Sequence, residues 1–156
     1  MRSRIICSLS LVVLPLLAYA QERIITAGSA LTETVCALGD CDKIIASDRT
    51  SLYPAQIQKL PSIGYRTGIS AEGIISLKPT LIIAEKQYVD EAVLQQLAAT
   101  QIRLVIVDRK ENWDDTKKFI RQIATALHRE AEGEKLVASN EELLSEAAAL
   151  LKALSH

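Results

Sequence analysis

The sequence predicts an α/β fold: a Rossmann-like lobe with a short parallel sheet flanked by helices, ending in a long helix. Three observations carry this prediction. Short apolar runs of strand length alternate four times with amphipathic helical segments. These runs are continuously apolar, which is typical of parallel strands that helices cover on both faces. After residue 113 the pattern is helical only and contains no further strand.

The first half of the chain supplies two of the expected strands. Gly28 and Ser29 separate the first strand from the first helix, and the helix is expected to end near Gly39. A segment with two prolines, two glycines and no sustained period follows, so it is expected to be an irregular connection. The expected elements are a strand over 23–27, a helix over 31–38, a strand over 43–46 and the irregular connection over 48–68.

The second half begins with a predicted N-cap at Ser70, and Pro79 ends the short helix that follows it. The expected elements are helices over 71–77 and 90–99, strands over 80–84 and 103–107, and a helical stripe that includes Phe119, Ile120, Ile123 and Leu127. A second helical stretch over 130–154 would extend about 35 Å, which is more than a small four-stranded lobe needs for its own cover.

Residues 1–20 have the pattern of a secretory signal peptide. Two arginines precede an uncharged run from Ile5 to Leu17, which is too short to span a bilayer, and the segment ends with Ala-Tyr-Ala. We therefore expect cleavage after Ala20. Gln21 would be the first mature residue, and it is not the cysteine that lipid attachment requires. The mature protein is expected to be free in the periplasm.

Composition and charge exclude several classes of function. The chain has 156 residues, of which 49% are hydrophobic and 24% charged, which favours one globular domain over a disordered segment. The expected mature chain of 136 residues carries 16 basic against 19 acidic side chains, a net charge of −3. No polybasic segment favours binding to nucleic acid or to a membrane.

Cys36 and Cys41 are the two cysteines of the expected mature chain, and export favours a disulfide between them. Cys36 lies in the last turn of the expected first helix, and Gly39 allows the chain to turn back toward it. The closed loop is short, so the bond would add about 2 kcal/mol at most. Two reduced, half-buried thiols are the alternative. A zinc site is less favoured, because no histidine or third cysteine lies nearby.

Several segments together resemble the periplasmic haem-binding proteins of bacterial haem import systems. These are substrate-binding proteins of ABC transporters with a helical backbone between two lobes. The segments are 25–39 (ITAGSALTETVCALG), Asp48 with Thr50-Ser51 and Tyr53-Pro54, 60–65 (LPSIGY) and 70–80 (SAEGIISLKPT). Cobalamin and siderophore binders share part of this pattern, but Gly-Tyr followed shortly by Ser-Ala-Glu-Gly resembles the haem branch.

In that family, two α/β lobes enclose the ligand in a cleft between them. The resemblance implies an N-terminal lobe over 21–128 and a truncated inter-lobe helix over 129–156, with the second lobe absent. A truncated product, a gene fragment and a separately encoded second lobe are all compatible with this. A single lobe leaves one porphyrin face in water, so weak haem binding and a haem-dependent dimer are expected.

The implied function is periplasmic capture of haem and its delivery to a membrane permease with its ATPase, downstream of an outer-membrane haem receptor. The implied ligand is haem b, held without a covalent bond, since no Cys-x-x-Cys-His motif is present. Binding of cobalamin or a ferric siderophore is the alternative, as is a folded but inactive lobe. An enzyme is not expected, because no phosphate-binding glycine motif or hydrolase nucleophile motif is found.

The resemblance assigns the axial ligand of the haem iron to Tyr65. Ferric iron accepts a phenolate oxygen, and a neighbouring cation favours the loss of the phenol proton. Arg66 is the candidate cation, although the family pattern has an arginine two positions after the tyrosine, where this chain has Thr67. The alternative for Tyr65 is simple packing against the sheet.

The resemblance also assigns a docking role to Glu72, which would pair with arginines of the permease. An acidic residue in the first turn of a helix also offsets the helix dipole, so both roles remain open. Tyr53, Tyr88 and Trp113 are expected to serve packing more than ligand contact. His128 is expected to cap a helix in a left-handed conformation, where the family usually has glycine.

Overall fold

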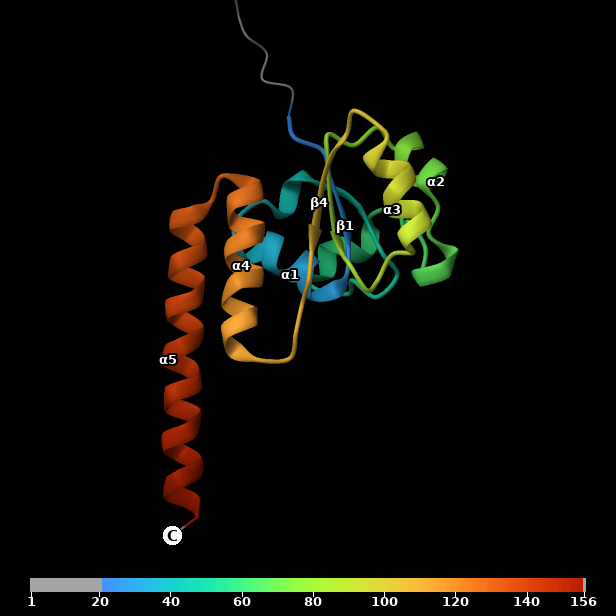
Figure 1. The fold of residues 1–156 in the computed structure, drawn as a ribbon. Helices are drawn as coiled ribbons and strands as arrows, with labels where there is room; N and C mark the ends of the chain where they lie inside the picture. Colours follow the sequence, from blue (N-terminus) through green and yellow to red (C-terminus); the bar gives the residue numbers. More distant parts are fainter. Residues whose placement is uncertain (1–20, 156) are drawn as a thin grey trace, which may run out of the picture.

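A computed structural model describes residues 21–155, so the expected signal peptide and His156 lie outside the described residues. The chain alternates strands and helices and ends in two consecutive helices (Figure 1). The strands are β1 (Ile24–Ala27), β2 (Ile44–Ser47), β3 (Leu81–Glu85) and β4 (Arg103–Val107). The α-helices are α1 (Ser29–Ala37), α2 (Ala71–Ser76), α3 (Glu91–Ala98), α4 (Trp113–Leu127) and α5 (Glu130–Leu154).

The four strands form one parallel sheet in the order β2-β1-β3-β4. Ile24 of β1 pairs with Ile44 of β2 on one side and with Leu81 of β3 on the other. Leu81 in turn pairs with Arg103 of β4. The predicted α/β class is therefore confirmed, and each predicted strand lies within one residue of its observed position.

Both faces of the sheet are covered, which explains the continuously apolar strands. Ile24 of β1 and Ile83 of β3 belong to a core that includes α1 and α4. Ile25 and Ile82, their neighbours in sequence, belong to a second core that includes α2 and α3. All four of these side chains are at most 1% exposed. Successive side chains of a strand point to opposite faces, so each strand needs an apolar residue at nearly every position.

The connection between β2 and α2 contains two short 3-10 helices, η2 (Ala55–Lys59) and η3 (Arg66–Gly68). Its backbone is anchored to the sheet, because the Ser47 N–H donates to the Pro61 carbonyl and the Ile63 N–H donates to the Ser47 carbonyl. Gly64 has φ +108, and a Cβ there would lie 2.7 Å from the Gly68 carbonyl oxygen. This glycine lets the chain fold back tightly just before Tyr65.

Local signals at Ser70 and His128 set the start of α2 and the end of α4, as the sequence indicated. The Ser70 hydroxyl accepts a hydrogen bond from the Gly73 N–H, so this residue is the N-cap of α2, as predicted. His128 has φ 56 and ψ 44 and ends α4 in the predicted left-handed conformation. Trp113 begins α4, packs against the first core and donates its indole N–H to Glu141 of α5.

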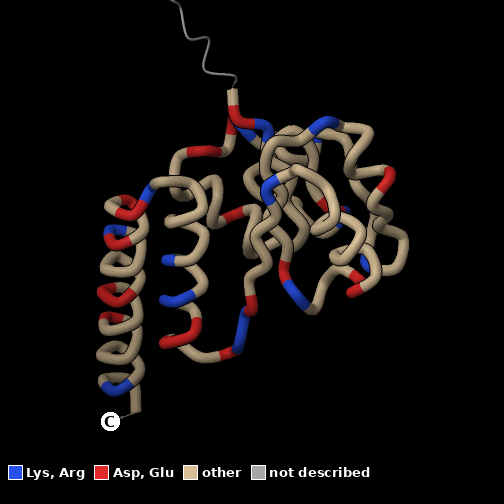
Figure 2. Tube along the Cα trace, turned by 45° about the horizontal axis from the view of Figure 1, so that its top comes forward, with Lys and Arg blue, Asp and Glu red and all other residues tan. Residues whose placement is uncertain are grey.

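The two halves of α5 have different surroundings. The first half packs on α4, where a Cβ at Gly133 would lie 2.6 Å from the Ala124 side chain, and Arg121 of α4 binds Glu134 through two hydrogen bonds. The last turns extend beyond the rest of the described chain (Figure 1). Their leucines are exposed: Leu143, Leu144, Leu150, Leu151 and Leu154. Basic and acidic positions are interspersed over the described chain (Figure 2).

Candidate functional site

A pocket lies at the carboxyl ends of the strands, which is where open parallel sheets commonly bind ligands. Its volume is about 340 Å³. Loops that follow β1, β2, β3 and β4 all contribute to it, together with the turn that carries Tyr65. The lining residues are Gly28, Ser29, Thr50, Tyr65, Arg66, Glu85, Gln87, Tyr88, Arg109 and Glu111.

Asp48 organises one side of this pocket, although it was not predicted as a site residue. The residue is 2% exposed, and both carboxylate oxygens are hydrogen-bonded. Oδ1 accepts from the Gly28 N–H at 2.9 Å and from the Ser51 hydroxyl at 2.7 Å. Oδ2 accepts from the Thr50 N–H at 2.7 Å, from the Thr50 hydroxyl and from the Tyr88 hydroxyl at 2.6 Å. We call Asp48, Thr50, Ser51 and Tyr88 the pocket base.

The hydrogen bonds of the pocket base set the charge of its members. Burial by itself raises the pKa of Asp48, but hydrogen bonds from Thr50, Tyr88, Ser51 and the Gly28 N–H outweigh it and hold that pKa below its ordinary value of 3.8. Burial is also the main cause that raises the pKa of Tyr88 to about 12, and the hydrogen bond to Asp48 adds to it. At neutral pH the base therefore consists of a carboxylate and a neutral phenol.

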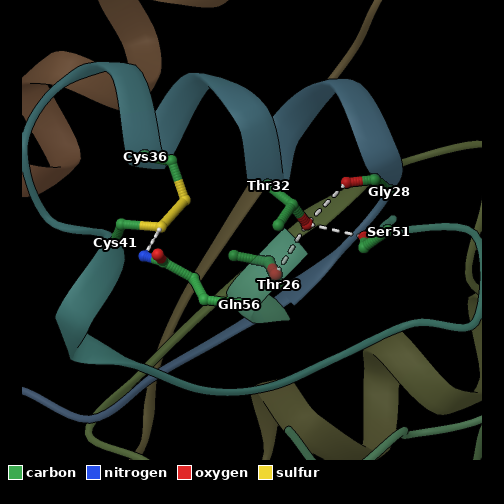
Figure 3. The surroundings of a disulfide bond; sticks show 7 residues. All are labelled: Thr26, Gly28, Thr32, Cys36, Cys41, Ser51 and Gln56. Atoms are coloured by element: carbon green, nitrogen blue, oxygen red, sulfur yellow. Dashed lines mark hydrogen bonds between the residues drawn. A yellow bond between two sulfur atoms is a disulfide. The ribbon is translucent and has the colours of Figure 1, made fainter. Parts of the chain in front are cut away.

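The network continues beneath the base into α1 (Figure 3). The Thr32 hydroxyl lies 2.8 Å from the Thr26 hydroxyl, 2.8 Å from the Ser51 hydroxyl and 3.0 Å from the Gly28 carbonyl oxygen. Thr26 and Thr32 are fully buried. These buried hydroxyls satisfy one another, and so they fix the start of α1 relative to β1 and the loop after β2.

Tyr65 and Arg66 lie next to Tyr88 on the open side of the pocket, and we call these two residues the pocket rim. Tyr65 is 49% exposed, and its ring meets the Tyr88 ring edge to face with centroids 6.2 Å apart and an interplanar angle of 85°. Arg66 has φ 42, a left-handed conformation that turns its side chain back over the rings. Its Cζ atom lies 5.9 Å from the Tyr65 ring centroid and 5.5 Å from that of Tyr88.

An ion pair forms a third wall. Arg109 Nε lies 3.4 Å from Glu85 Oε2, and the Glu85 carboxylate lies directly over Gly28. A Cβ at Gly28 would lie 2.5 Å from Glu85 Oε1, and Gly28 has φ +132. A glycine is therefore needed there both for the backbone conformation and for the close approach of the carboxylate.

The predicted disulfide residues lie at the other end of α1. Cys36 and Cys41 are bonded in the structure, with an S–S distance of 2.07 Å, and the Gln56 amide donates to Cys41 Sγ (Figure 3). Gly39, between them, has φ +95. The bond closes the turn from α1 to η1 (Cys41–Lys43), whereas the pocket lies at the start of α1.

Glu72 is exposed in the first turn of α2 and is not a lining residue of the pocket. Tyr53 is 68% exposed, so it contributes less packing than expected from the sequence. Tyr88 also differs from the expectation of packing alone, because its hydroxyl is hydrogen-bonded to Asp48. A sequence signal for Asp48 exists: Thr50 and Ser51 follow it at the spacing of an Asx turn.

The pocket offers the rings of Tyr65 and Tyr88 and the guanidinium group of Arg66, while the guanidinium group of Arg109 is paired with Glu85. The side chain of Glu111 also lines the pocket. Within residues 21–155, no group of three or more histidine, cysteine, aspartate or glutamate side chains is arranged to hold a metal ion. No helix in this range is long and apolar enough to cross a membrane. The aromatic rings of the pocket and the Arg66 guanidinium are groups that can stack on a flat ligand.

Comparison with known proteins identifies the class. Residues 24–155 match the family described as periplasmic binding protein, and the chain belongs to this family. A curated relative is the vitamin B12-binding protein of Pectobacterium atrosepticum, 36% identical over 126 residues that make up 80% of this chain and 45% of the relative. Its counterpart in Pectobacterium carotovorum is 36% identical over 123 residues, which are 78% of this chain and 44% of that one.

Similar solved structures carry a different ligand in their names. The periplasmic heme-binding protein RhuT from Roseiflexus sp. RS-1 superposes with a TM-score of 0.81 at 34% identity, covering 85% of this chain and 51% of that one. A periplasmic heme binding protein from Pseudomonas aeruginosa gives a TM-score of 0.80 at 27% identity, covering 85% and 47%. This chain thus spans about half the length of the relatives it matches.

Proposed function

We propose that this chain provides a haem-binding lobe of a periplasmic substrate-binding protein that delivers haem to an ABC permease. The single observation that carries the proposal is the pocket rim, where a half-exposed tyrosine and an arginine lie together at the carboxyl end of the sheet. Tyr65 would bind the ferric iron as a phenolate. Arg66 would favour that charged form by lying beside the ring.

The pocket base supports the choice of Tyr65 over Tyr88. The Tyr88 hydroxyl donates to a buried carboxylate, and its pKa is raised to about 12. Among the described residues, none forms a hydrogen bond with the Tyr65 hydroxyl. A phenol whose proton is held by Asp48 is a poor source of phenolate, whereas Tyr65 is open to a ligand from outside the lobe.

Cobalamin is the second candidate ligand, because the curated relatives are named vitamin B12-binding proteins. A corrinoid carries its own lower ligand and needs no tyrosinate from the protein. The two ligands therefore differ in what they would require of Tyr65. A ferric siderophore is the third alternative, and it would likewise need no tyrosinate from the protein.

Parallel titrations with hemin and cyanocobalamin test the proposal. The purified chain should give a saturable hemin spectrum of the high-spin tyrosinate type and no saturable change with cyanocobalamin. Saturable binding of cyanocobalamin with no tyrosinate spectrum for hemin would replace the haem proposal with the cobalamin alternative. Absence of saturable binding for both would favour the inactive lobe.

A haem bound to one lobe would expose its second face. Losing 150 Å² of apolar contact costs about 4 kcal/mol, nearly a thousandfold in affinity. We therefore propose weak binding with a haem-dependent dimer, which light scattering with and without hemin detects. A monomeric complex with nanomolar affinity would contradict this part of the proposal.

Glu72 is proposed as the docking residue for the permease, since it is exposed on the first turn of α2. Glu72→Lys should abolish cross-linking to permease vesicles while hemin binding stays unchanged. Glu91, exposed in the first turn of α3, is the matched control. Equal cross-linking by the Glu72→Lys and Glu91→Lys variants would assign docking to another surface.

Export is proposed from the same family membership together with residues 1–20. Intact-mass analysis of protein recovered from the periplasm should give a chain that begins at Gln21. A chain retained in the cytoplasm with residues 1–20 attached would contradict export.

A further inference from the structure

Tyr88 joins the buried and the exposed parts of the pocket. Its hydroxyl donates to Asp48 Oδ2 at 2.6 Å, and Thr50 Oγ1 lies 3.3 Å away. Asp48 is itself fixed by the Gly28 N–H and by the Ser51 hydroxyl. The position of the Tyr88 ring is therefore determined from below, by a hydrogen-bond network that belongs to three different segments of the chain.

The upper part of the same ring contacts the pocket rim. The Tyr65 ring meets it edge to face at a centroid distance of 6.2 Å, and Arg66 Cζ lies 5.5 Å from its centroid. Among the described residues, no acidic side chain forms an ion pair with Arg66. Contact with the two tyrosine rings is thus what the structure provides to orient this exposed guanidinium.

We propose that Tyr88 is a positioning residue: its ring, anchored through Asp48, holds Tyr65 and Arg66 in the arrangement that binds the ligand. The inference rests on the proposed function, because it gives Tyr88 a role toward the axial ligand Tyr65. Tyr88 itself does not bind the iron. Tyr88 contributes to ligand binding through two groups: the hydroxyl, which anchors the side chain, and the ring, which supports the rim.

Two substitutions separate these contributions. Tyr88→Phe keeps the ring and removes the hydrogen bond to Asp48, whereas Tyr88→Leu removes both. We expect hemin affinity to fall about threefold in Tyr88→Phe and about tenfold in Tyr88→Leu. Tyr53→Leu is the matched control, because Tyr53 is 68% exposed and does not line the pocket. Its affinity should stay within about twofold of the wild type.

A role in positioning also predicts an effect on the spectrum. The hemin complex loses its tyrosinate spectrum when acid protonates the ligand, and that transition should move to higher pH by about one unit in Tyr88→Leu, the equivalent of a tenfold change. A residue that only stabilised the fold would lower the unfolding midpoint without moving this transition. Affinity and transition both unchanged in Tyr88→Phe and Tyr88→Leu would overturn the inference.

A ligand-free measurement separates this inference from the proposed function. In the wild type and in Tyr53→Leu, nuclear Overhauser contacts between the Arg66 side chain and the Tyr65 ring should be present, and in Tyr88→Leu they should be lost. Their persistence in Tyr88→Leu would overturn the inference even if hemin does not bind. Hemin binding without a tyrosinate spectrum in the wild type would instead contradict the proposed function alone. Should Tyr88→Leu not fold, Tyr88→Phe decides by the same contacts, which should weaken.

Discussion

The pocket base and the pocket rim meet where the Tyr88 and Tyr65 rings are in contact, yet their polar groups are satisfied in opposite ways. Asp48 on the base is 2% exposed and accepts hydrogen bonds on both oxygens from within the chain. Tyr65 on the rim is 49% exposed, and no described residue forms a hydrogen bond with its hydroxyl. The contrast teaches that substitution of the buried Asp48 should mainly change stability, whereas substitution of the rim residues Tyr65 and Arg66 should mainly change ligand binding.

The largest effect on stability is expected from Asp48→Ala. The substitution leaves the Gly28 N–H, the Ser51 hydroxyl and the Tyr88 hydroxyl without their acceptor, and unsatisfied buried groups are costly. We expect a loss of about 4 kcal/mol in the free energy of unfolding, measured with urea. Asp108→Ala, at an exposed position, is the control and should stay within about 0.5 kcal/mol. An equal loss of stability in both variants would contradict the role of Asp48 in stabilising the pocket base.

Acid should weaken the base as well. The pKa of Asp48 is held below 3.8 in the folded state, so its contribution to stability is present above that value and is lost as pH falls through the folded pKa. Asp40 behaves alike: burial by itself raises its pKa, but hydrogen bonds from Arg129 and Lys43 outweigh it and lower the pKa. The urea concentration at the midpoint of unfolding should therefore decrease as the pH is lowered below about 4.

Asp48→Asn sharpens the acid prediction because it removes one of the two buried carboxylates, Asp40 and Asp48, whose pKa is lowered. The variant should be less stable at neutral pH and lose less of its remaining stability between pH 4 and pH 3 than the wild type does. A pH dependence as steep as that of the wild type would mean that Asp48 does not contribute to it.

The disulfide lies apart from both the base and the rim of the pocket. Its removal therefore tests whether stability can change without a change in hemin affinity. The double variant Cys36→Ser, Cys41→Ser should lose about 2 kcal/mol or less, because the closed loop is short. Its hemin affinity should equal that of the wild type. Mass mapping of protein recovered from the periplasm under non-reducing conditions should give the Cys36–Cys41 peptide pair, and free thiols at both positions would refute the bond.

The smallest change in stability is expected on the rim. Arg66→Gln removes an exposed guanidinium, so the free energy of unfolding should change by no more than about 0.5 kcal/mol. Hemin affinity should nevertheless fall, by roughly fivefold, because the cation beside the phenol is lost. A loss of stability without a loss of affinity would place Arg66 with the base and contradict the comparison.

The strands and helices could be predicted because each is determined by its own short segment. The apolar run over 80–84 and the N-cap at Ser70 are local signals, and both agree with the structure. The motif that assigns the axial-ligand role to Tyr65 is also a local signal. The left-handed φ of Arg66, which turns its side chain over the two rings, leaves no such signal in the sequence.

The link between Asp48 and Tyr88 in the pocket base could not be predicted, since it joins residues far apart in the sequence. Asp48 and Tyr88 are 40 positions apart and meet only because β2 and β3 flank β1 in the sheet with their carboxyl ends at one edge. Glu85 and Arg109 meet across the next pair of strands in the same way. Strand order therefore carries the information that local patterns lack.

The most direct test is a hemin titration of Tyr65→Phe beside the wild type, with the free energy of unfolding measured on the same samples. The account predicts that the variant keeps the wild-type free energy of unfolding to within about 0.5 kcal/mol and loses the tyrosinate spectrum. An unchanged spectrum in Tyr65→Phe would contradict the assignment of the rim tyrosine as the ligand of the haem iron.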